Sequence, residues 1–145
     1  MGPNGRPCCR QCGTEVKPPR RTFCSAACVH EWKVRTSSSY AKRQVYLRDK
    51  GVCKSCQIDT KVVAAELWEI RLLQGEGQEI LTKRLHGIPA SRKVWRRKYG
   101  GGLWDLDHIV PVKDGGGSCG IENMQTLCIP CHRTKTTRCQ RASTR

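Results

Sequence analysis

Large apolar side chains are scarce in this 145-residue chain, which has one phenylalanine, two methionines and three tyrosines. So few large residues build only a thin hydrophobic core, and chains of this kind gain stability from disulfides or bound metal. No apolar run approaches the roughly 20 residues of a membrane-spanning helix. The first residues, Met1–Asn4, begin no apolar signal segment. We therefore expect neither a membrane protein nor a secreted one.

Acidic side chains are also few: 12 Asp and Glu residues stand against 27 Lys and Arg residues, for a formal net charge of +15. Such an excess can simply keep a surface solvated. On so short a chain it favours a polyanionic partner, and the lack of a basic amphipathic helix favours nucleic acid over a membrane surface. At this length we expect one domain, or one domain with a small added module.

Cysteine, in contrast, is abundant: the chain has 11 cysteines. Most of them fall into pairs at metal-ligand spacing, which indicates structural zinc rather than disulfides because nothing points to an oxidising compartment. The first set has the order Cys-x2-Cys-x11-Cys-x3-Cys, and a helix capped by Ser25 would bring its second pair to the same ion. The expected ligands are Cys9, Cys12, Cys24 and Cys28, with Cys8 as an alternative to Cys9.

A second zinc site is expected to join two pairs that lie far apart in the sequence. Cys53-x2-Cys56 has its natural counterpart in Cys128-x2-Cys131. Because the entropic cost of closing a loop grows only logarithmically with its length, the long segment between the pairs is tolerable. Four thiolates leave no open position on the ion, so both zinc sites would be structural.

Two further helices are expected around the second cysteine pair. The first runs over 40–50 and stops at Gly51, with an apolar stripe on one side. The stripe consists of Val45, Tyr46 and Leu47. The second helix runs over 61–74. Its buried or half-buried side chains are expected to be Val62, Ala65, Leu67, Trp68, Ile70, Leu72 and Leu73.

The segment over 82–98 mixes cations with aromatic side chains and is followed by a run of three glycines. Cations that bind phosphate and rings that stack on bases suit a single-stranded or distorted nucleic acid. A solvated loop would have a similar composition. The residues expected to contact nucleic acid here are Arg92, Lys93, Trp95, Arg96, Arg97 and Lys98.

The last third of the chain reads as strand, strand, helix. Residues 103–110 predict a strand, 124–127 a short return strand, and a helix begins at 128–130, where proline fits a first turn. The first strand offers Leu103, Trp104, Leu106, Ile109 and Val110 to a core. Because successive side chains of a strand face opposite sides, Asp107 and His108 can serve one site only if the strand bends or the ion lies at its edge.

Residues 107–136 carry the order Asp-His-Ile-x-Pro, a glycine-rich turn, then Asn-x-Gln-x-Leu-Cys-x2-Cys-His-x2-Lys-Thr. This order resembles the HNH signature of the ββα-metal nucleases, with no catalytic position missing. The resemblance continues upstream through Cys9–Cys12, Thr22–Ser25, Val29–Trp32 and Gly51–Cys53. It implies a small, zinc-stabilised α+β fold, with a ββα-metal (HNH) core preceded by a four-cysteine zinc module and helices.

The resemblance also implies the roles of single residues. His108 would take a proton from water, which suits imidazole because histidine titrates near neutral pH. Asp107 and His132 would hold one divalent cation, Mg²⁺ or Mn²⁺, although such a mixed ligand set also accepts Ni²⁺ and Zn²⁺. Asn123 would either hold the loop of His108 or join the metal. Lys135 would contact the cut strand or lie on the helix surface as an ordinary lysine.

We thus expect four segments: a four-cysteine zinc module over 1–36, a connecting helix over 37–50, an HNH nuclease domain over 51–139 with a basic helical insertion at 58–102, and a basic tail over 140–145. The expected function is DNA endonuclease, leaving 5′-phosphate and 3′-hydroxyl ends, with no membrane or small-molecule partner. The sequence is similar to HNH domains of fork-remodelling annealing helicases. That similarity implies branched, fork or single-stranded DNA as substrate, a larger ATP-dependent remodelling protein, and nuclear replication or repair. The alternative is a catalytically weak DNA-binding module of such a protein.

Overall fold

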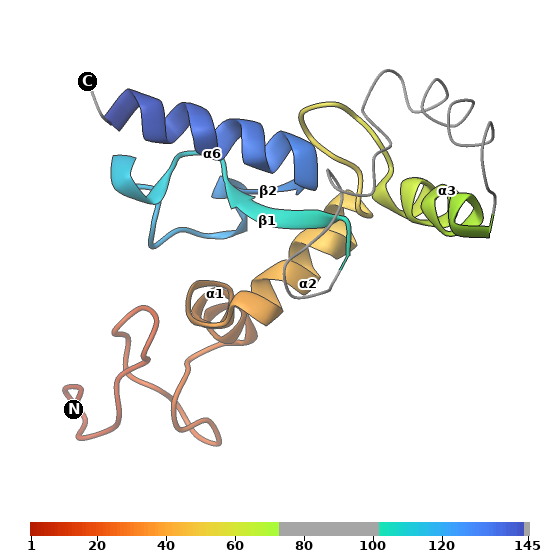
Figure 1. Ribbon diagram of the computed structural model, residues 1–145. Coiled ribbons are helices and arrows are strands. Elements are labelled where there is room, and N and C mark those ends of the chain that lie inside the picture. The colour runs from red at the N-terminus through yellow and green to blue at the C-terminus, as the bar shows by residue number, and fades with distance from the viewer. Residues whose placement is uncertain (73–101, 144–145) are drawn as a thin grey trace. The chain divides into compact units, whose positions relative to one another are not determined.

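The computed structural model describes residues 1–72 and 102–143 (Figure 1). They form a small α+β protein, as expected from the sequence. The elements in chain order are α1 (Ala26–Thr36), α2 (Ser38–Asp49), α3 (Thr60–Leu72), β1 (Trp104–His108), the 3-10 turns η1 (Val112–Asp114) and η2 (Ile121–Asn123), β2 (Met124–Cys128) and α6 (Ile129–Ser143). Within the described residues, no helix is both long enough and apolar enough to span a bilayer.

The chain divides into two compact units that do not follow the order of the sequence. Unit 1 consists of Met1–Val45 and His108–Met124, and unit 2 of Tyr46–Asp107 and Gln125–Arg145. The first cysteine set lies in unit 1 and the second in unit 2.

Serine side chains set the starts of the first two helices. Ser25 caps α1 as expected, because its hydroxyl accepts the N–H of Cys28 at 3.1 Å. Ser37 ends α1 and accepts the N–H of Tyr40 at 3.4 Å, so that α2 follows after a single residue. The expected helix over 40–50 therefore begins two residues early and ends at Asp49. Lys50 and Gly51 then both have positive φ, 55° and 82°, and the chain turns out of the helix.

The buried face of α2 differs in part from the expected stripe. Ala41 and Val45, one turn apart, are buried, whereas Leu47 is 50% exposed. A step of two residues turns a helix by about 200°, so Leu47 lies opposite Val45. The expected apolar stripe of Val45, Tyr46 and Leu47 was therefore wrong at Leu47, which does not share the buried face of Val45. In unit 2 the ring of Tyr46 stacks on Trp104, with 5.9 Å between the ring centres.

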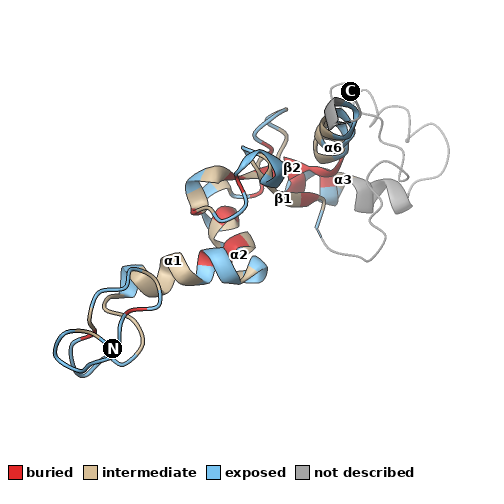
Figure 2. Cartoon of the chain, turned by 90° about the vertical axis from the view of Figure 1, so that its left-hand side faces the viewer, coloured by how far each residue is buried: buried red, intermediate tan, exposed pale blue. Residues whose placement is uncertain are grey.

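The core of unit 2 is built around its cysteines. Cys53, Val63, Leu127, Cys128 and Ile129 form one buried cluster, and Figure 2 shows buried residues gathered on β2. The half-buried Cys56, Ile58, Leu103 and Cys131 pack against it. A core this small gains little stability from apolar burial alone. A metal ion bound by these cysteines would therefore stabilise unit 2 at the centre of its core.

Helix α3 confirms the expected helix but contributes a different side chain to the core. Val63 is 1% exposed, whereas Val62 is 54% exposed and Ala65 is also exposed. The run of apolar residues does not determine which face of α3 is buried. Given the helical period, burial of the face that carries Val63 leaves Val62 and Ala65 exposed. The expected burial of Leu67, Trp68, Ile70, Leu72 and Leu73 concerns side chains outside the described part of the chain.

Strands β1 and β2 pair in a two-stranded sheet, and α6 runs alongside them (Figure 1). The expected strand over 103–110 is shorter, because β1 ends at His108. Ile109 and Val110 are consequently 50% and 46% exposed rather than part of a core. The carbonyl of Leu103 accepts the N–H of Ile129 at 3.1 Å, which ties the start of α6 to the entry of β1.

The end of α2 is tied to β2 by a buried carboxylate. Asp49 accepts the backbone N–H of Thr126 at 3.2 Å and the guanidinium of Arg48 at 2.8 and 3.0 Å, and its side chain is only 3% exposed. Burial acts to raise the pKa of this carboxyl, but the hydrogen bonds from Arg48 and Thr126 outweigh it and hold the pKa below its usual value. The charged carboxylate thus holds the β2 backbone in place.

Candidate functional site

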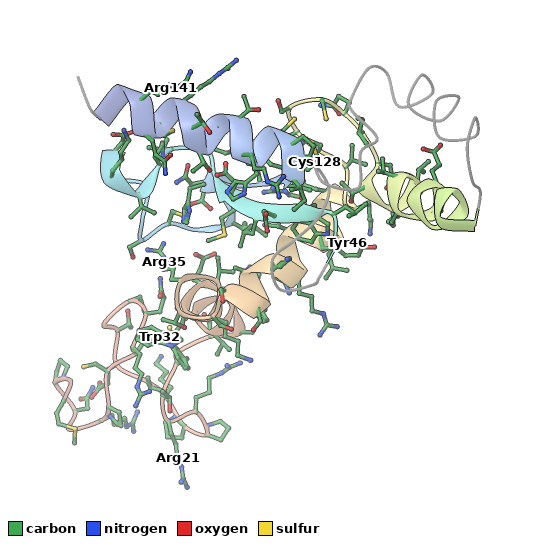
Figure 3. All side chains as sticks on the ribbon, in the orientation of Figure 1. Arg21, Trp32, Arg35, Tyr46, Cys128 and Arg141 are labelled. Atoms are coloured by element: carbon green, nitrogen blue, oxygen red, sulfur yellow. The ribbon has the colours of Figure 1, made fainter. Side chains whose placement is uncertain are left out.

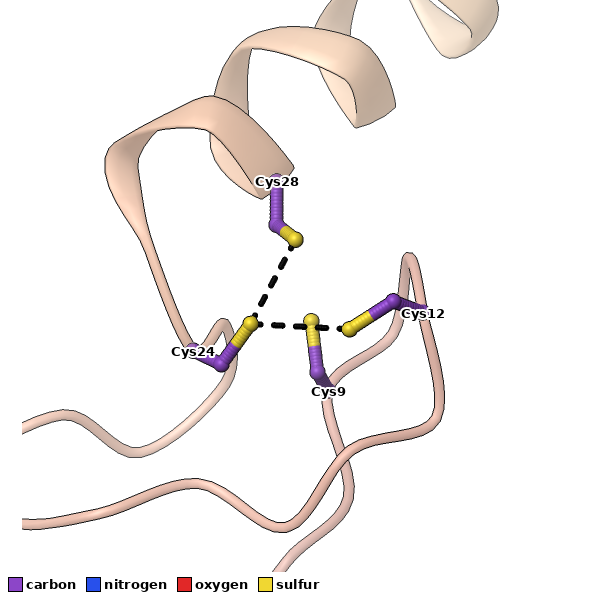
Figure 4. Close-up of side chains that lie close together, drawn as sticks. All are labelled: Cys9, Cys12, Cys24 and Cys28. Carbon is purple, nitrogen blue, oxygen red and sulfur yellow. Dashed lines mark hydrogen bonds between the residues drawn. The ribbon is translucent and has the colours of Figure 1, made fainter.

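The first cysteine set comes together in unit 1. Cys9 and Cys12 lie on a tight turn, Cys24 precedes α1, and Cys28 lies in its first turn (Figure 4). The Sγ atoms of Cys12 and Cys24 are 3.5 Å apart, and those of Cys24 and Cys28 are 3.4 Å apart. Cys9 is the fourth member of the group, as expected, and Cys8 is exposed.

The second set comes together in unit 2. Cys53, Cys56, Cys128 and Cys131 form one group although 72 positions separate Cys56 from Cys128, whose Sγ atoms are 3.6 Å apart. Figure 3 labels Cys128 near the junction of β2 and α6. Cys53 and Cys128 are fully buried.

Both sets use the same local fold for their first pair. Cys9 donates its N–H to the carbonyl of Thr14 and accepts the N–H of Gly13, at 2.8 and 2.9 Å. Cys53 repeats the pattern with Ile58 and Gln57, at 2.9 Å each. The residue four positions after the cysteine has positive φ in both turns, 74° at Gly13 and 60° at Gln57. Glycine adopts this conformation without strain, and the sequence supplies it in the first turn only.

Because the four thiols of each group lie close together, some of them have a raised pKa and others a lowered one. A hydrogen bond from Cys128 lowers the pKa of Cys53 to about 4 despite its burial, and the same bond raises the pKa of Cys128. Burial raises the pKa of Cys56 to about 11. In the first set the hydrogen bond to Cys28 raises the pKa of Cys24 to about 12, whereas burial of Cys9 is outweighed by backbone N–H donors that lower its pKa to about 6.

Both groups fit a tetrahedral zinc ion. Zinc–sulfur bonds of about 2.3 Å place the corners of a tetrahedron about 3.8 Å apart. The sulfur separations of 3.4 to 3.6 Å in the structure approach this value, and within each group the four sulfurs lie within 4.8 Å of one another. A divalent cation also stabilises all four thiolates at once. Each group can therefore hold one structural zinc ion.

A third cluster in unit 2 joins β1 to α6. Nε2 of His132 lies 3.9 Å from Oδ1 of Asp107. Two atoms bound to one small divalent ion at about 2.1 Å can be at most about 4.2 Å apart, so this pair can share an ion. The other carboxylate oxygen, Oδ2, accepts hydrogen bonds from Gln125 at 2.8 Å and Lys135 at 2.5 Å. Asp107 is 14% exposed.

Asp105 is a member of this cluster that the sequence analysis did not identify. Its Oδ2 lies 3.2 Å from Nδ1 of His132. A carboxylate only accepts hydrogen bonds, so Nδ1 carries a hydrogen toward Asp105, while Nε2 lies on the side of Asp107. The spacing in the sequence could have identified Asp105, because Asp105 and Asp107 are two positions apart on a strand and therefore share a face.

In unit 1, Asn123 closes the loop that follows His108. Its side-chain oxygen accepts the N–H of Val110 at 2.8 Å, and its Nδ2 donates to the carbonyls of Val110 and Gly116 at 3.2 and 3.1 Å. Its own carbonyl accepts the N–H of Ile109 at 2.8 Å. These bonds match the loop-holding alternative for Asn123. Gly116 is required here, because a Cβ would overlap the Val110 carbonyl and lie 2.7 Å from Nδ2 of Asn123.

His108 lies at the last position of β1, directly before this loop. Asp107, its neighbour in the sequence, belongs to unit 2, whereas His108 belongs to unit 1. The residues expected to contact nucleic acid from the insertion lie outside the described part of the chain. They are Arg92, Lys93, Trp95, Arg96, Arg97 and Lys98.

Strands β1 and β2, helix α6, the second cysteine group and the Asp107 cluster together define the class of protein to which this segment is similar. Residues 96–138 match the family model of the HNH endonucleases. The chain is also 32% identical over 149 residues to the "DNA annealing helicase and endonuclease ZRANB3" of Mus musculus, and 31% identical over 143 residues to that of Bos taurus.

These similarities cover 91% of this chain but only 13% of each relative. The human protein of the same name is 32% identical over 118 residues, 80% of this chain. No solved structure matches the chain.

Proposed function

We propose that the chain is a metal-dependent DNA endonuclease, acting as the nuclease part of a larger ATP-dependent DNA-remodelling protein in the nucleus. The separation of 3.9 Å between Asp107 Oδ1 and His132 Nε2, in the order typical of HNH domains, carries the proposal. The net charge of the chain, +15, suits a polyanionic substrate. Similarity to DNA annealing helicases and endonucleases supports branched or fork DNA as the substrate.

Asp107 and His132 would hold the catalytic divalent cation. A bound ion supplies Lewis-acid stabilisation of the charge that develops on a phosphate oxygen and the leaving 3′-oxygen. Asp105 would act as a positioning residue, because its hydrogen bond at Nδ1 fixes the ring orientation and tautomer of His132. Lys135, paired with Oδ2 of Asp107, would bring a positive charge to the phosphate being cut.

His108 would act as the general base and take a proton from the attacking water. Asn123 would fix the loop that follows His108 through its bonds to Val110 and Gly116. The electron pair of the water oxygen would form the new bond to phosphorus, the bond from phosphorus to the 3′-oxygen would break, and the leaving 3′-oxygen would take a proton from solvent water. The products are a 5′-phosphate and a 3′-hydroxyl end.

The direct test incubates the chain with end-labelled fork DNA and supercoiled plasmid in Mg²⁺ or Mn²⁺. Cleavage products that a ligase can rejoin without prior phosphorylation support the proposed chemistry. Ends that need a kinase or a phosphatase before ligation contradict it. Tight binding of the fork with no cut in either metal favours the second candidate, a DNA-binding module whose cleavage depends on the rest of a larger protein.

A further inference from the structure

Unit 2 contains a cavity of about 400 Å³ beside the second cysteine group and the Asp107 cluster. Leu127 is the buried member of its lining, and the turn over Cys53–Cys56 (the second zinc turn), β2 and α6 all contribute lining residues. The full lining is Lys54, Ser55, Gln125, Leu127, Cys131, Thr134, Lys135 and Arg138. We call this feature the zinc-turn groove.

The spacing of the lining residues on α6 shows that they form one face. Cys131, Thr134, Lys135 and Arg138 stand at i, i+3, i+4 and i+7, which is a single stripe of a helix. The stripe begins at a zinc-group cysteine and ends at an exposed arginine. Arg141, labelled in Figure 3 near the end of α6, continues the positive charge beyond the groove.

The second zinc turn contributes Lys54 and Ser55 to the lining. Lys54 lies between Cys53 and Cys56, and its backbone N–H donates to the carbonyl of Thr126 at 2.9 Å. The backbone of Lys54 is thus fixed to β2, while its side chain is exposed. A lysine on a fixed backbone loses less conformational freedom when it binds an anion than one on a mobile loop.

The charge of the groove has one sign. Among its eight described lining residues three are cations, Lys54, Lys135 and Arg138, and none is acidic. The groove also reaches the proposed catalytic cluster, because Gln125 and Lys135 both bind Oδ2 of Asp107. A ligand in the groove would therefore be a polyanion that passes next to the carboxylate proposed to hold the catalytic ion.

We propose that the zinc-turn groove binds the phosphodiester backbone of one DNA strand, with Lys54 and Arg138 contacting phosphates on the strand that Asp107 and His132 act on. This inference rests on the proposed function and assigns Lys54 and Arg138 to its substrate. Repeated phosphates along one strand match cations spread along a groove better than a single small anion does. The second zinc would then have a double task, since it stabilises the core and presents Lys54 to the DNA.

The test measures the salt dependence of DNA binding by fluorescence anisotropy. The probe is a fluorescein-labelled fork with single-stranded arms, and all proteins carry His108→Ala so that the proposed cleavage does not interfere. Lys54→Glu and Arg138→Glu should each weaken binding. Each should also make the fall of log K with log salt shallower, reducing the magnitude of the negative slope by about 1. The matched control is Lys61→Glu, the same charge change on an exposed lysine outside the groove. Zinc content and melting temperature confirm that each variant is folded.

If Lys54→Glu and Lys61→Glu reduce the affinity and the magnitude of the salt slope equally, the groove is not a strand-binding site and the inference is wrong. Cleavage is measured separately with His108 present. If the native chain cuts DNA and Lys54→Glu cuts it with unchanged KM and kcat, the groove inference fails alone. If the native chain does not cut but binding still depends on Lys54 and Arg138, the groove stands and the nuclease proposal fails.

Discussion

At the scale of single residues, the two nitrogens of His132 have separate partners. Asp105 lies at Nδ1 and Asp107 at Nε2, at 3.2 and 3.9 Å. Such a carboxylate behind a metal-binding imidazole raises ligand basicity and fixes the ring. The assignment of Asp105 as a positioning residue can therefore be tested apart from DNA cleavage.

We expect Asp105→Asn to weaken Mn²⁺ binding at the catalytic cluster by about 10- to 100-fold, because the carboxylate no longer orients His132. Isothermal titration of zinc-loaded protein with Mn²⁺ measures the change, and ¹⁵N chemical shifts of the His132 ring report its tautomer. Asp114→Asn, in the exposed turn η1, is the control. Unchanged Mn²⁺ affinity and tautomer in Asp105→Asn would show that Asp105 has no positioning role.

At the scale of elements, the second zinc turn, β2 and α6 share one core. Cys128 ends β2, is fully buried and belongs to both the apolar cluster and the cysteine group. Structural zinc contributes about 10 to 16 kcal/mol shared among four ligands, or about 3 kcal/mol for each. Loss of one ligand should therefore loosen the core and the metal site together.

We expect Cys128→Ser to destabilise unit 2 by about 3 kcal/mol or more, through loss of a zinc ligand. Cys139→Ser, on α6 and outside the cysteine group, should change stability by less than about 1 kcal/mol. Urea unfolding with zinc present measures both, together with zinc content. Equal losses in the two variants would mean that Cys128 acts by packing and not as a ligand.

Local signals in the sequence predicted most of the elements. The Ser25 cap, the turn at Gly51 and the spacing within each cysteine pair depend on neighbouring residues only, and these features are found in the structure. The errors arose where burial depends on a distant partner. Val62 and Ala65 are exposed because the core selects Val63, and no neighbouring residue indicates which face of α3 that core would contact.

The candidate site was predicted to a similar depth. Residues that follow a spaced motif, such as the second cysteine set, could be assigned because their order alone pairs them. Asp105 was missed because the motif begins at Asp107, and its role depends on the contact between β1 and α6. The zinc-turn groove was likewise out of reach, since Lys54 and Arg138 are 84 positions apart and meet only after folding.

At the scale of the whole molecule, two cysteine groups that fit zinc compensate for the thin apolar core. Stability should therefore depend on pH through the thiols. In the second set Cys56 and Cys128 have raised pKa values and hold protons at neutral pH, whereas Cys53, with a pKa of about 4, has lost its proton. Zinc binding needs all of these as thiolates, so protons compete with zinc and affinity falls as pH falls.

We expect the apparent zinc affinity of the second set to rise about 100-fold for each pH unit between about pH 6.5 and 7.5, since zinc must displace at least the protons of Cys56 and Cys128. Competition with a coloured chelator measures it, with Cys9→Ser and Cys12→Ser in place so that only the second set binds tightly. A rise of about tenfold or less per pH unit would mean that at most one proton leaves, and would contradict this picture of the site.

The central claim is that this chain cuts DNA with His108 as the base, and plasmid nicking tests it most directly. Nicking of supercoiled DNA in Mn²⁺ is compared for the native chain, His108→Ala and the control His30→Ala, whose imidazole lies 3.0 Å from the hydroxyl of Tyr40 in unit 1. We expect nicking by the native chain and the control, and a rate at least about 100-fold lower for His108→Ala with unchanged melting temperature and DNA affinity. Nicking by His108→Ala at the native rate would contradict it.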